Sequence, residues 1–541
     1  MRWLALAVAA VLALAGCDER STTACPSGKL CLQAGNQAEP ISIDPPRNNS
    51  FQGDSVVSDL FVGLVTDDAA SRSIPGAALS WTASPDGLTW TFKLRPAQWS
   101  DGTPVTADDF VFALRRMENP KSAIEYSYLG YVLKNAERVN TDRAPPEALG
   151  VRALGPLTLE IRLEHPAPYL PELLKHHLFY PVPAHVVRKW GDAWIQPAHF
   201  VSNGPYTLTA WKLGDHIRLV KNPRFYDASN VCLDEVYYYP TSDSISAERR
   251  VRRGELDLNI DIQSNRIAYL RRPDQIPTYV KTYTWLGVDY LAFNTRLTKF
   301  KDRRVRQALT MAIDRDFIVA KLLRSGMEPA YAFTPPGVAN YPGGAKPYWA
   351  DWPLARRQGE ARRLLGGAGY GPAHPLKLEI KHRSTSDPTL FMPAIQADWR
   401  SIGVEATLAP NEGQIAYQAY RTRDFEIADA TWIADYDDAL TFLALMQSTT
   451  GAQNYGDYNN PAYDGLLLKA DNEPDAVRRA GYLKLAEQMM LEDAPVAPVF
   501  FYISKNLVSP NITGWVDNVP DHHRKRWLCF KDAEARRRGG Q

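Results

Sequence analysis

Residues 90–117 read WTFKLRPAQWSDGTPVTADDFVFALRRM, and this stretch joins a strand signal to a helix signal. Trp90, Phe92 and Leu94 alternate with polar residues, as in a half-buried β-strand. The pair Asp101-Gly102 marks a turn after that strand. The stretch therefore predicts a strand, a turn and a helix in succession, which is typical of mixed α/β architectures.

The helix expected after this turn has both a start signal and an apolar face. Thr106, with Asp109 three residues later, forms a capping-box pattern. The neighbouring acids Asp108 and Asp109 suit the dipole at a helix start, so we interpret them as first-turn residues and not as an acid/base pair. Apolar residues follow at i, i+3, i+4 and i+7, namely Phe110, Ala113, Leu114 and Met117.

The composition of the whole chain narrows the class of protein. The chain has 541 residues with 62 Lys+Arg and 61 Asp+Glu, a formal net charge of +1, which argues against a nucleic-acid partner. Its length is several times that of a usual domain, so two or three well-cored lobes are expected. Gly and Pro are spread evenly and no flexible linker stands out, so these lobes should be interwoven by crossing strands.

The N-terminus reads MRWLALAVAAVLALAGC, one positive charge followed by an apolar run that is shorter than the roughly 20 residues of a membrane span. This pattern predicts a signal peptide over residues 1–16. The run ends in a sequence that resembles the bacterial lipobox, so Cys17 is the predicted lipidation site and residues 17–32 a lipid-anchored tether. Asp18 resembles a signal for retention at the outer face of the inner membrane, in the periplasm. In a Gram-positive cell the same anchor would place the protein on the cell surface.

Four cysteines remain after Cys17, in a compartment where disulfides persist. We favour a short Cys25–Cys31 loop and a Cys232–Cys529 bridge, because the latter two cysteines lie in apolar, strand-like surroundings. Two buried free thiols are the alternative for the second pair.

Motifs for catalysis and for metal binding are missing from the sequence. The ten histidines form no His-Glu-x-x-His spacing, and no nucleophile elbow or phosphate loop is present. The run His522 to Arg526 is interpreted as a solvated turn before the last strand. We therefore expect no enzyme, no catalytic residue, no metal site and no cofactor, and the high Trp and Tyr content favours a protein that captures a ligand between lobes.

A series of segments resembles the bacterial extracellular solute-binding proteins of family 5, the oligopeptide-binding receptors of peptide ABC importers. The resemblance runs from about Gly35 to Phe530, and the order of its segments makes it specific. The segments are 39–45, 90–95, 99–110, Asn203-Gly204-Pro205-Tyr206, 293–294, 302–309, 329–331, 334–336 and Trp432-Ile433-Ala434-Asp435-Tyr436.

This resemblance implies an α/β fold of the periplasmic-binding-protein type II class, with three interwoven lobes that close like a trap around the ligand. Lobe I would comprise residues 33–61, 200–286 and 506–541. Lobe II would comprise residues 62–199, and lobe III residues 287–505.

The resemblance also implies the binding residues. Asp435 would hold the α-ammonium of a peptide, and the main chain of Thr431, Trp432 and Ile433 would form the strand edge along which the peptide lies. Trp432 would also form a pocket wall. Tyr126 and Tyr502 correspond to tyrosines that line the site in similar proteins.

Two departures from the family pattern affect these expectations. Asp429 stands where oligopeptide-binding members carry an arginine for the carboxylate of short peptides. The ligand would then be longer, or carry a basic group, or meet its carboxylate at another residue such as Arg421 or Arg423. The family's own disulfide is absent, because Gly287 and Ile433 occupy its positions.

The sequence thus predicts a monomeric, lipid-anchored receptor that delivers short peptides to an ABC permease and its ATPase subunits. The alternatives are the same receptor class for a murein peptide, an opine-like compound or a chelated metal, a signalling or chaperone-like role, and a secreted hydrolase.

Overall fold

The computed structural model describes residues 23–538, so the predicted signal peptide and Cys17 lie outside the described residues. The fold is mixed α/β and is dominated by one eleven-stranded sheet. Its strands follow the order β15 (Val404–Asn411), β14 (Leu376–Arg383), β16 (Ile427–Ile433), β12 (Val280–Phe293), β17 (Val496–Val508), β11 (Leu258–Ile260), β1 (Cys31–Gly35), β10 (Glu235–Tyr239), β9 (His216–Lys221) and β8 (Tyr206–Lys212), with β13 (Glu328–Pro329) on β17.

A separate four-stranded sheet carries the segment that opened the sequence analysis. Its order is β4 (Ala78–Ala83), β5 (Thr89–Leu94), β7 (Thr158–Arg162) and β6 (Val151–Gly155). The predicted strand is β5, and its apolar positions Trp90, Phe92 and Leu94 are buried. The predicted helix is α3 (Ala107–Glu118), and the Asp109 carboxylate accepts the Thr106 N–H at 2.9 Å as the capping box requires.

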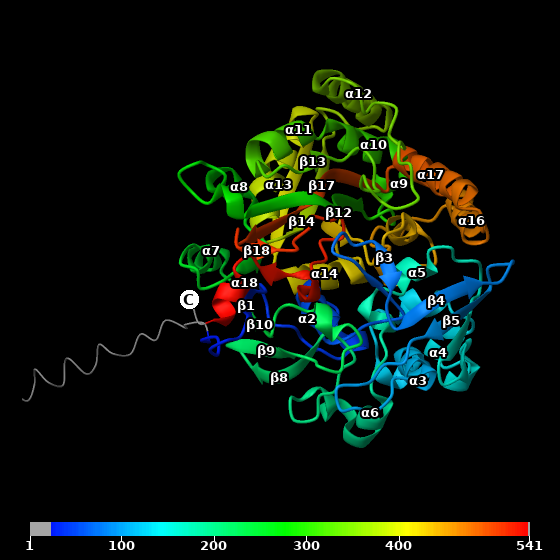
Figure 1. The fold of residues 1–541 in the computed structure, drawn as a ribbon. Helices are drawn as coiled ribbons and strands as arrows, with labels where there is room; N and C mark the ends of the chain where they lie inside the picture. The colour runs from blue at the N-terminus through cyan, green and yellow to red at the C-terminus, as the bar shows by residue number, and fades with distance from the viewer. Residues whose placement is uncertain (1–22, 539–541) are drawn as a thin grey trace, which may run out of the picture.

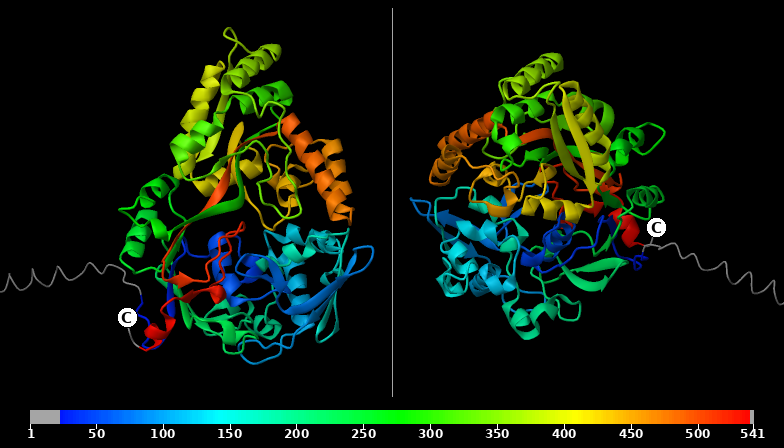
Figure 2. Two further views of the ribbon diagram at one scale, coloured as in Figure 1. Left: turned by 45° about the horizontal axis from the view of Figure 1, so that its top comes forward. Right: turned by 180° about the vertical axis from the view of Figure 1, so that it is seen from behind.

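The two sheets form two bodies of the molecule. Figure 1 shows β4 and β5 beside α3 and α4 (Ala136–Asn140), away from α10 (Arg303–Ala312), α12 (Leu354–Gly367) and α13 (Ser386–Ser401). Both views of Figure 2 place the blue and cyan part of the chain below its yellow and orange part, which includes α16 (Pro461–Asp471) and α17 (Ala476–Asp493). Strands β12 and β17, of 14 and 13 residues, are the longest of the large sheet.

Both expected disulfides are present. Cys25 and Cys31 are bonded with their Cα atoms 5.7 Å apart. Cys232 and Cys529 are bonded with their Cα atoms 5.5 Å apart, across 297 residues of sequence. The second bond ties the loop before β10 to the C-terminal strand β19 (Cys529–Phe530).

The charged run near the C-terminus contradicts the sequence-based expectation of a solvated turn. Arg524, Lys525 and Arg526 are buried, with exposed fractions of 4–6%. The Arg524 guanidinium contacts the buried Asp67 carboxylate and also donates to the Ser58 carbonyl oxygen at 3.0 Å. Arg524 thus packs against residues more than 450 positions earlier in the sequence, and Arg526 is paired with Asp227 at 2.5 Å.

No helix within residues 23–538 is long and apolar enough to cross a membrane.

Candidate functional site

One edge of strand β16 is free at its C-terminal end. Neighbouring strand β14 pairs with β16 only as far as Ala428, whereas β12 continues along the other edge. The Ala434 N–H donates to the Leu286 carbonyl oxygen at 2.8 Å. Because bonded and non-bonded pairs alternate in an antiparallel ladder, the main-chain groups of Thr431 and Ile433 point to the free edge.

A cavity of about 470 Å³ lies beside this free edge. It is built from β16 and helix α14 (Gly413–Thr422) on one side, and from residues of the N-terminal segment and of the four-stranded-sheet body on the other. Its size falls within the range of about 300–1,000 Å³ found for small-ligand sites. The cavity is lined by residues 48–51, 125–126, 175–177 and 431–435, together with Asp54, Gln414, Tyr417, Arg421, Gln453, Tyr455, Pro520 and His522.

Asp435 lines this cavity and forms no ion pair within residues 23–538. Its N–H donates to the Thr441 hydroxyl at 3.3 Å, but its carboxylate accepts no hydrogen bond from residues 23–538. Burial raises the pKa of Asp435 to about 7, since no neighbouring cation offsets the desolvation. A carboxylate kept in this state favours a ligand that brings a positive charge.

Aromatic groups surround Asp435. Tyr126 lines the cavity, and burial together with the Asp435 charge raises the pKa of its hydroxyl well above the usual range. Trp432 also lines the cavity, and its indole N–H donates to the Thr441 hydroxyl at 3.4 Å. Of the six residues expected from the sequence, five therefore line one cavity: Asp435, Trp432, Ile433, Thr431 and Tyr126.

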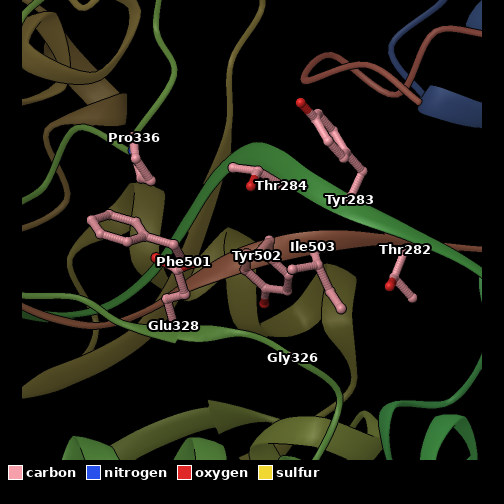
Figure 3. A pocket seen from close by; sticks show the side chains of 9 residues that line it. All are labelled: Thr282, Tyr283, Thr284, Gly326, Glu328, Pro336, Phe501, Tyr502 and Ile503. Atoms are coloured by element: carbon pink, nitrogen blue, oxygen red, sulfur yellow. The ribbon is translucent and has the colours of Figure 1, made fainter. Parts of the chain in front are cut away.

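Tyr502 lies behind the cavity wall. Its side chain lines a smaller cavity of about 250 Å³ between β12, β13 and β17, which Figure 3 shows from close by. Its hydroxyl lies 3.2 Å from the Thr431 hydroxyl and donates to Asp289 at 3.0 Å. Tyr502 thus contacts the main cavity through Thr431, which is itself a lining residue.

Asp429 belongs to a buried charge cluster. Asp289 and Asp429 have no exposed surface, and both are paired with Arg383 at 3.0 Å. Burial and the Asp429 charge raise the pKa of Asp289 well above its usual range. Arg383 is therefore held by two carboxylates through its Nε and Nη2 atoms.

The remaining cations near the cavity differ in their ion pairs and hydrogen bonds. Lys175 lines the cavity but is paired with Glu172 at 2.6 Å. Arg423 does not line the cavity and is paired with Asp457 at 3.1 Å. Arg421 lines the cavity, and its only protein partner within residues 23–538 is the Gln418 side-chain oxygen at 3.5 Å.

Several lining residues were not predicted from the sequence. Gln414, Tyr417 and Arg421 fall at i, i+3 and i+7, so one face of α14 turns toward the cavity; this spacing was readable but gave no reason to prefer that helix. His177 also lines the cavity, with its Nδ1 atom 2.9 Å from Asp54.

The register of β12 and β16 brings together Gly287 and Ile433, the two positions where the resemblance led us to look for a disulfide. Gly287 lies directly opposite Ile433 in this antiparallel pair. A Cβ atom added at Gly287 would come within 2.4 Å of the Ile433 side chain. The isoleucine thus occupies the space over the glycine.

Comparisons with known proteins identify relatives for nearly the whole chain. The family model described as "Bacterial extracellular solute-binding proteins, family 5 Middle" matches residues 72–454. The periplasmic oligopeptide-binding protein OppA of Salmonella typhimurium is 34% identical over 499 residues, which cover 91% of this chain and 91% of that protein. The solved structure of OppA from Burkholderia pseudomallei is 33% identical and superimposes with a TM-score of 0.83, covering 93% of this chain and 99% of the other.

Two solved structures of the murein tripeptide-binding protein MppA, one of them described as the Escherichia coli protein, are both 32% identical to this chain. One superimposes with a TM-score of 0.83, covering 93% of this chain and 98% of the other. The other, described as an unliganded open form, gives a TM-score of 0.77 and covers 94% and 98%. The arrangement of this chain is therefore closer to the first form than to the unliganded open one.

Proposed function

The chain belongs to the bacterial extracellular solute-binding proteins of family 5, and we propose that it captures short peptides and delivers them to an ABC permease. The observation that carries the proposal is the Asp435 carboxylate, which is largely removed from solvent, has no hydrogen-bond or ion-pair partner within residues 23–538 and lies next to a free strand edge. An α-ammonium group would supply the missing charge through a hydrogen bond worth about 1.5–3 kcal/mol.

The free edge of β16 would bind the peptide main chain. Thr431 and Ile433 direct their N–H and C=O groups toward the cavity side, so an extended peptide can add to the sheet as a further strand. Such pairing uses no side chain of the peptide. Sequence-tolerant binding follows, with Trp432 and Tyr126 as apolar walls.

Arg421 would meet the peptide carboxylate. Arg421 lines the cavity and contacts only the Gln418 side chain among residues 23–538, whereas Lys175 and the nearby Arg423 are each paired with a carboxylate. Asp429 stands two residues before the Thr431-Trp432 step, where the resemblance implies an arginine in oligopeptide-binding relatives. Its carboxylate is paired with Arg383. Among the described residues that line the cavity, Arg421 is the arginine.

The anchoring and partners are part of the same proposal. A lipid on Cys17 would hold a monomeric protein at the outer face of the inner membrane, where a permease with its ATPase subunits could receive the peptide. Mass spectrometry of the mature protein would show a diacylglyceryl group at Cys17. Release of a Cys17→Ser variant from the membrane fraction would support the anchor, and its retention would contradict it.

Native mass spectrometry of protein purified from its host tests the ligand class. We expect co-purified peptides, whereas an opine-like compound or a chelated metal in the spectrum would assign another solute to the same receptor. Titration with the tripeptide series Ala-X-Ala, as free peptides and as N-acetyl derivatives, follows. Acetylation should weaken binding at least tenfold, and the peptides should be recovered uncut; cleaved peptides would indicate a hydrolase.

Variants at the two ends of the site separate its two roles. Asp435→Ala should weaken binding of free tripeptides and leave N-acetyl derivatives unaffected. Arg421→Gln should weaken binding of the free acids about tenfold or more but not of the C-terminal amides. Arg423→Gln and the exposed Arg249→Gln on α7 (Ser244–Arg252) remove the same charge elsewhere and serve as controls. A loss in Arg423→Gln instead of Arg421→Gln would transfer the carboxylate role.

A further inference from the structure

The ring of Tyr169 contacts two groups of the other body of the molecule. It stacks on Tyr436 with ring centroids 5.5 Å apart and planes 17° apart. The Arg479 guanidinium lies 4.7 Å from the centroid of the same ring. Tyr169 is 7% exposed, so this side chain is largely shielded from solvent.

Tyr169 and its two contact residues come from different parts of the fold. Tyr169 directly precedes the short helix α5 (Leu170–Leu173), which follows the four-stranded sheet. Tyr436 follows β16 of the large sheet, and Arg479 lies in the first turn of α17. A movement of one body relative to the other would separate the Tyr169 ring from Tyr436 and Arg479.

The receiving side is rigid. Asp438 accepts two hydrogen bonds from Arg479, at 2.7 and 2.9 Å, and both side chains are buried. The Asp438 carboxylate also accepts the Leu440 N–H at 2.9 Å. The chain from Tyr436 to Asp438 is thus fixed to α17, and Asp435 directly precedes it.

We propose that Tyr169 is a positioning residue for ligand capture, which packs against Tyr436 and Arg479 when the two bodies close over the cavity and thereby fixes the segment that carries Asp435. This inference rests on the proposed function. Tyr169 does not line the cavity, so its effect on a ligand passes through the closed arrangement. In the open protein Tyr169 would not contact Tyr436 or Arg479, and these contacts would contribute nothing to its stability.

The test compares Tyr169→Ala with Tyr169→Phe, which keeps the stacking ring. The probe is the Ala-X-Ala tripeptide that binds the wild-type protein most tightly. We expect Tyr169→Ala to bind it about tenfold more weakly, through a faster dissociation rate with an unchanged association rate, because a stacked pair and a cation–π contact are lost. Tyr169→Phe should stay within twofold of the wild type.

Two further measurements separate a closing contact from a purely structural one. The melting temperature of the ligand-free protein should be the same in Tyr169→Ala and wild type, and the compaction seen by small-angle X-ray scattering on adding the tripeptide should be reduced. Equal affinity and equal compaction in Tyr169→Ala would overturn the inference. The inference would also be overturned if Tyr169→Ala lowered the melting temperature of the ligand-free protein by as much as that of the peptide-bound protein. If the wild type binds no tripeptide, the proposed function fails and this inference falls with it.

Discussion

The charge state of Asp435 predicts how peptide affinity depends on pH. The free protein holds this carboxyl at a pKa of about 7 through burial. An α-ammonium group binds only the ionised form, so below pH 7 each binding event must release a proton. Affinity should therefore fall as pH is lowered through 7, and it should be flat above that until the peptide ammonium itself deprotonates, near 8.

The magnitude follows from the same value. A carboxyl of pKa 7 is about nine-tenths ionised at pH 8 and about one-hundredth ionised at pH 5, which sets a ceiling near 100-fold. The ammonium lowers the pKa of the bound carboxyl by about 1–3, so the observed loss should be about 10- to 100-fold. Asp435→Asn should bind about 10- to 150-fold more weakly at pH 8, and should lack the loss on the acid side.

Ligand-free stability should change in the opposite direction. The folded pKa of Asp435 lies above the unfolded value of 3.8, so this group's unfavourable contribution begins as pH rises past 3.8 and is complete above about 7. A difference of this size corresponds to about 4 kcal/mol at most. Asp435→Asn should therefore unfold at a higher denaturant concentration than the wild type at pH 8, and the gain should vanish near pH 4.

Calorimetric titration with the tightest Ala-X-Ala tripeptide, from pH 5 to pH 8, measures the affinity term. Asp437→Asn is the matched control, because the Asp437 carboxylate is engaged by the Ala339 N–H at 2.7 Å and does not line the cavity. His176, His177 and His522 also face the cavity. An acid-side loss that persists in Asp435→Asn would assign the pH dependence to these histidines and refute the reasoning.

Three further predictions concern stability. Replacing both Cys232 and Cys529 by Ala should cost about 2–5 kcal/mol in urea unfolding, and replacing both Cys25 and Cys31 should cost less, since the first bond closes a loop of 297 residues and the second a loop of 6; equal losses would contradict this. Arg383→Met should cost about 3–5 kcal/mol at pH 7, because two buried carboxylates lose their cation, with a smaller loss at pH 5; a loss below 1 kcal/mol would contradict it. Glu118 is fully buried with both carboxylate oxygens unpaired, and its pKa is raised to about 8 by burial, so Glu118→Met should stabilise the protein increasingly as pH rises from 4.5 to 8, and an effect independent of pH would count against this.

Local patterns in the sequence predicted the local structure well. The alternation at Trp90, Phe92 and Leu94 and the Thr106 capping pattern each depend on neighbours within a few residues, and both were confirmed. The mixed α/β class and the family followed from such segments in order. The Cys232–Cys529 bond was favoured from apolar surroundings alone, and it was confirmed although its cysteines are 297 residues apart.

Charged residues were the least predictable from local patterns, because their state depends on partners far away in the sequence. Arg524 in the C-terminal run was expected in solvent, but it finds a carboxylate at Asp67 and is buried. Within the site, Asp429 was read as a reversed ligand charge, whereas its partner Arg383 lies 46 residues earlier, on the adjacent strand. No spacing rule links such pairs, since the pairing is set by strand order in the large sheet.

The same comparison explains why Asp435 carries the functional argument. Two fully buried acids of the large-sheet body are each paired with a cation: Asp438 has Arg479, and Asp429 has Arg383. A buried carboxylate without such partners destabilises the folded protein, and the cost is retained where a ligand offsets it. Glu118 is unpaired as well but does not line the cavity, whereas Asp435 lines it beside a free strand edge, so replacing the Asp435 carboxylate should raise stability while it lowers affinity. A variant that lost both would place Asp435 among the structural acids.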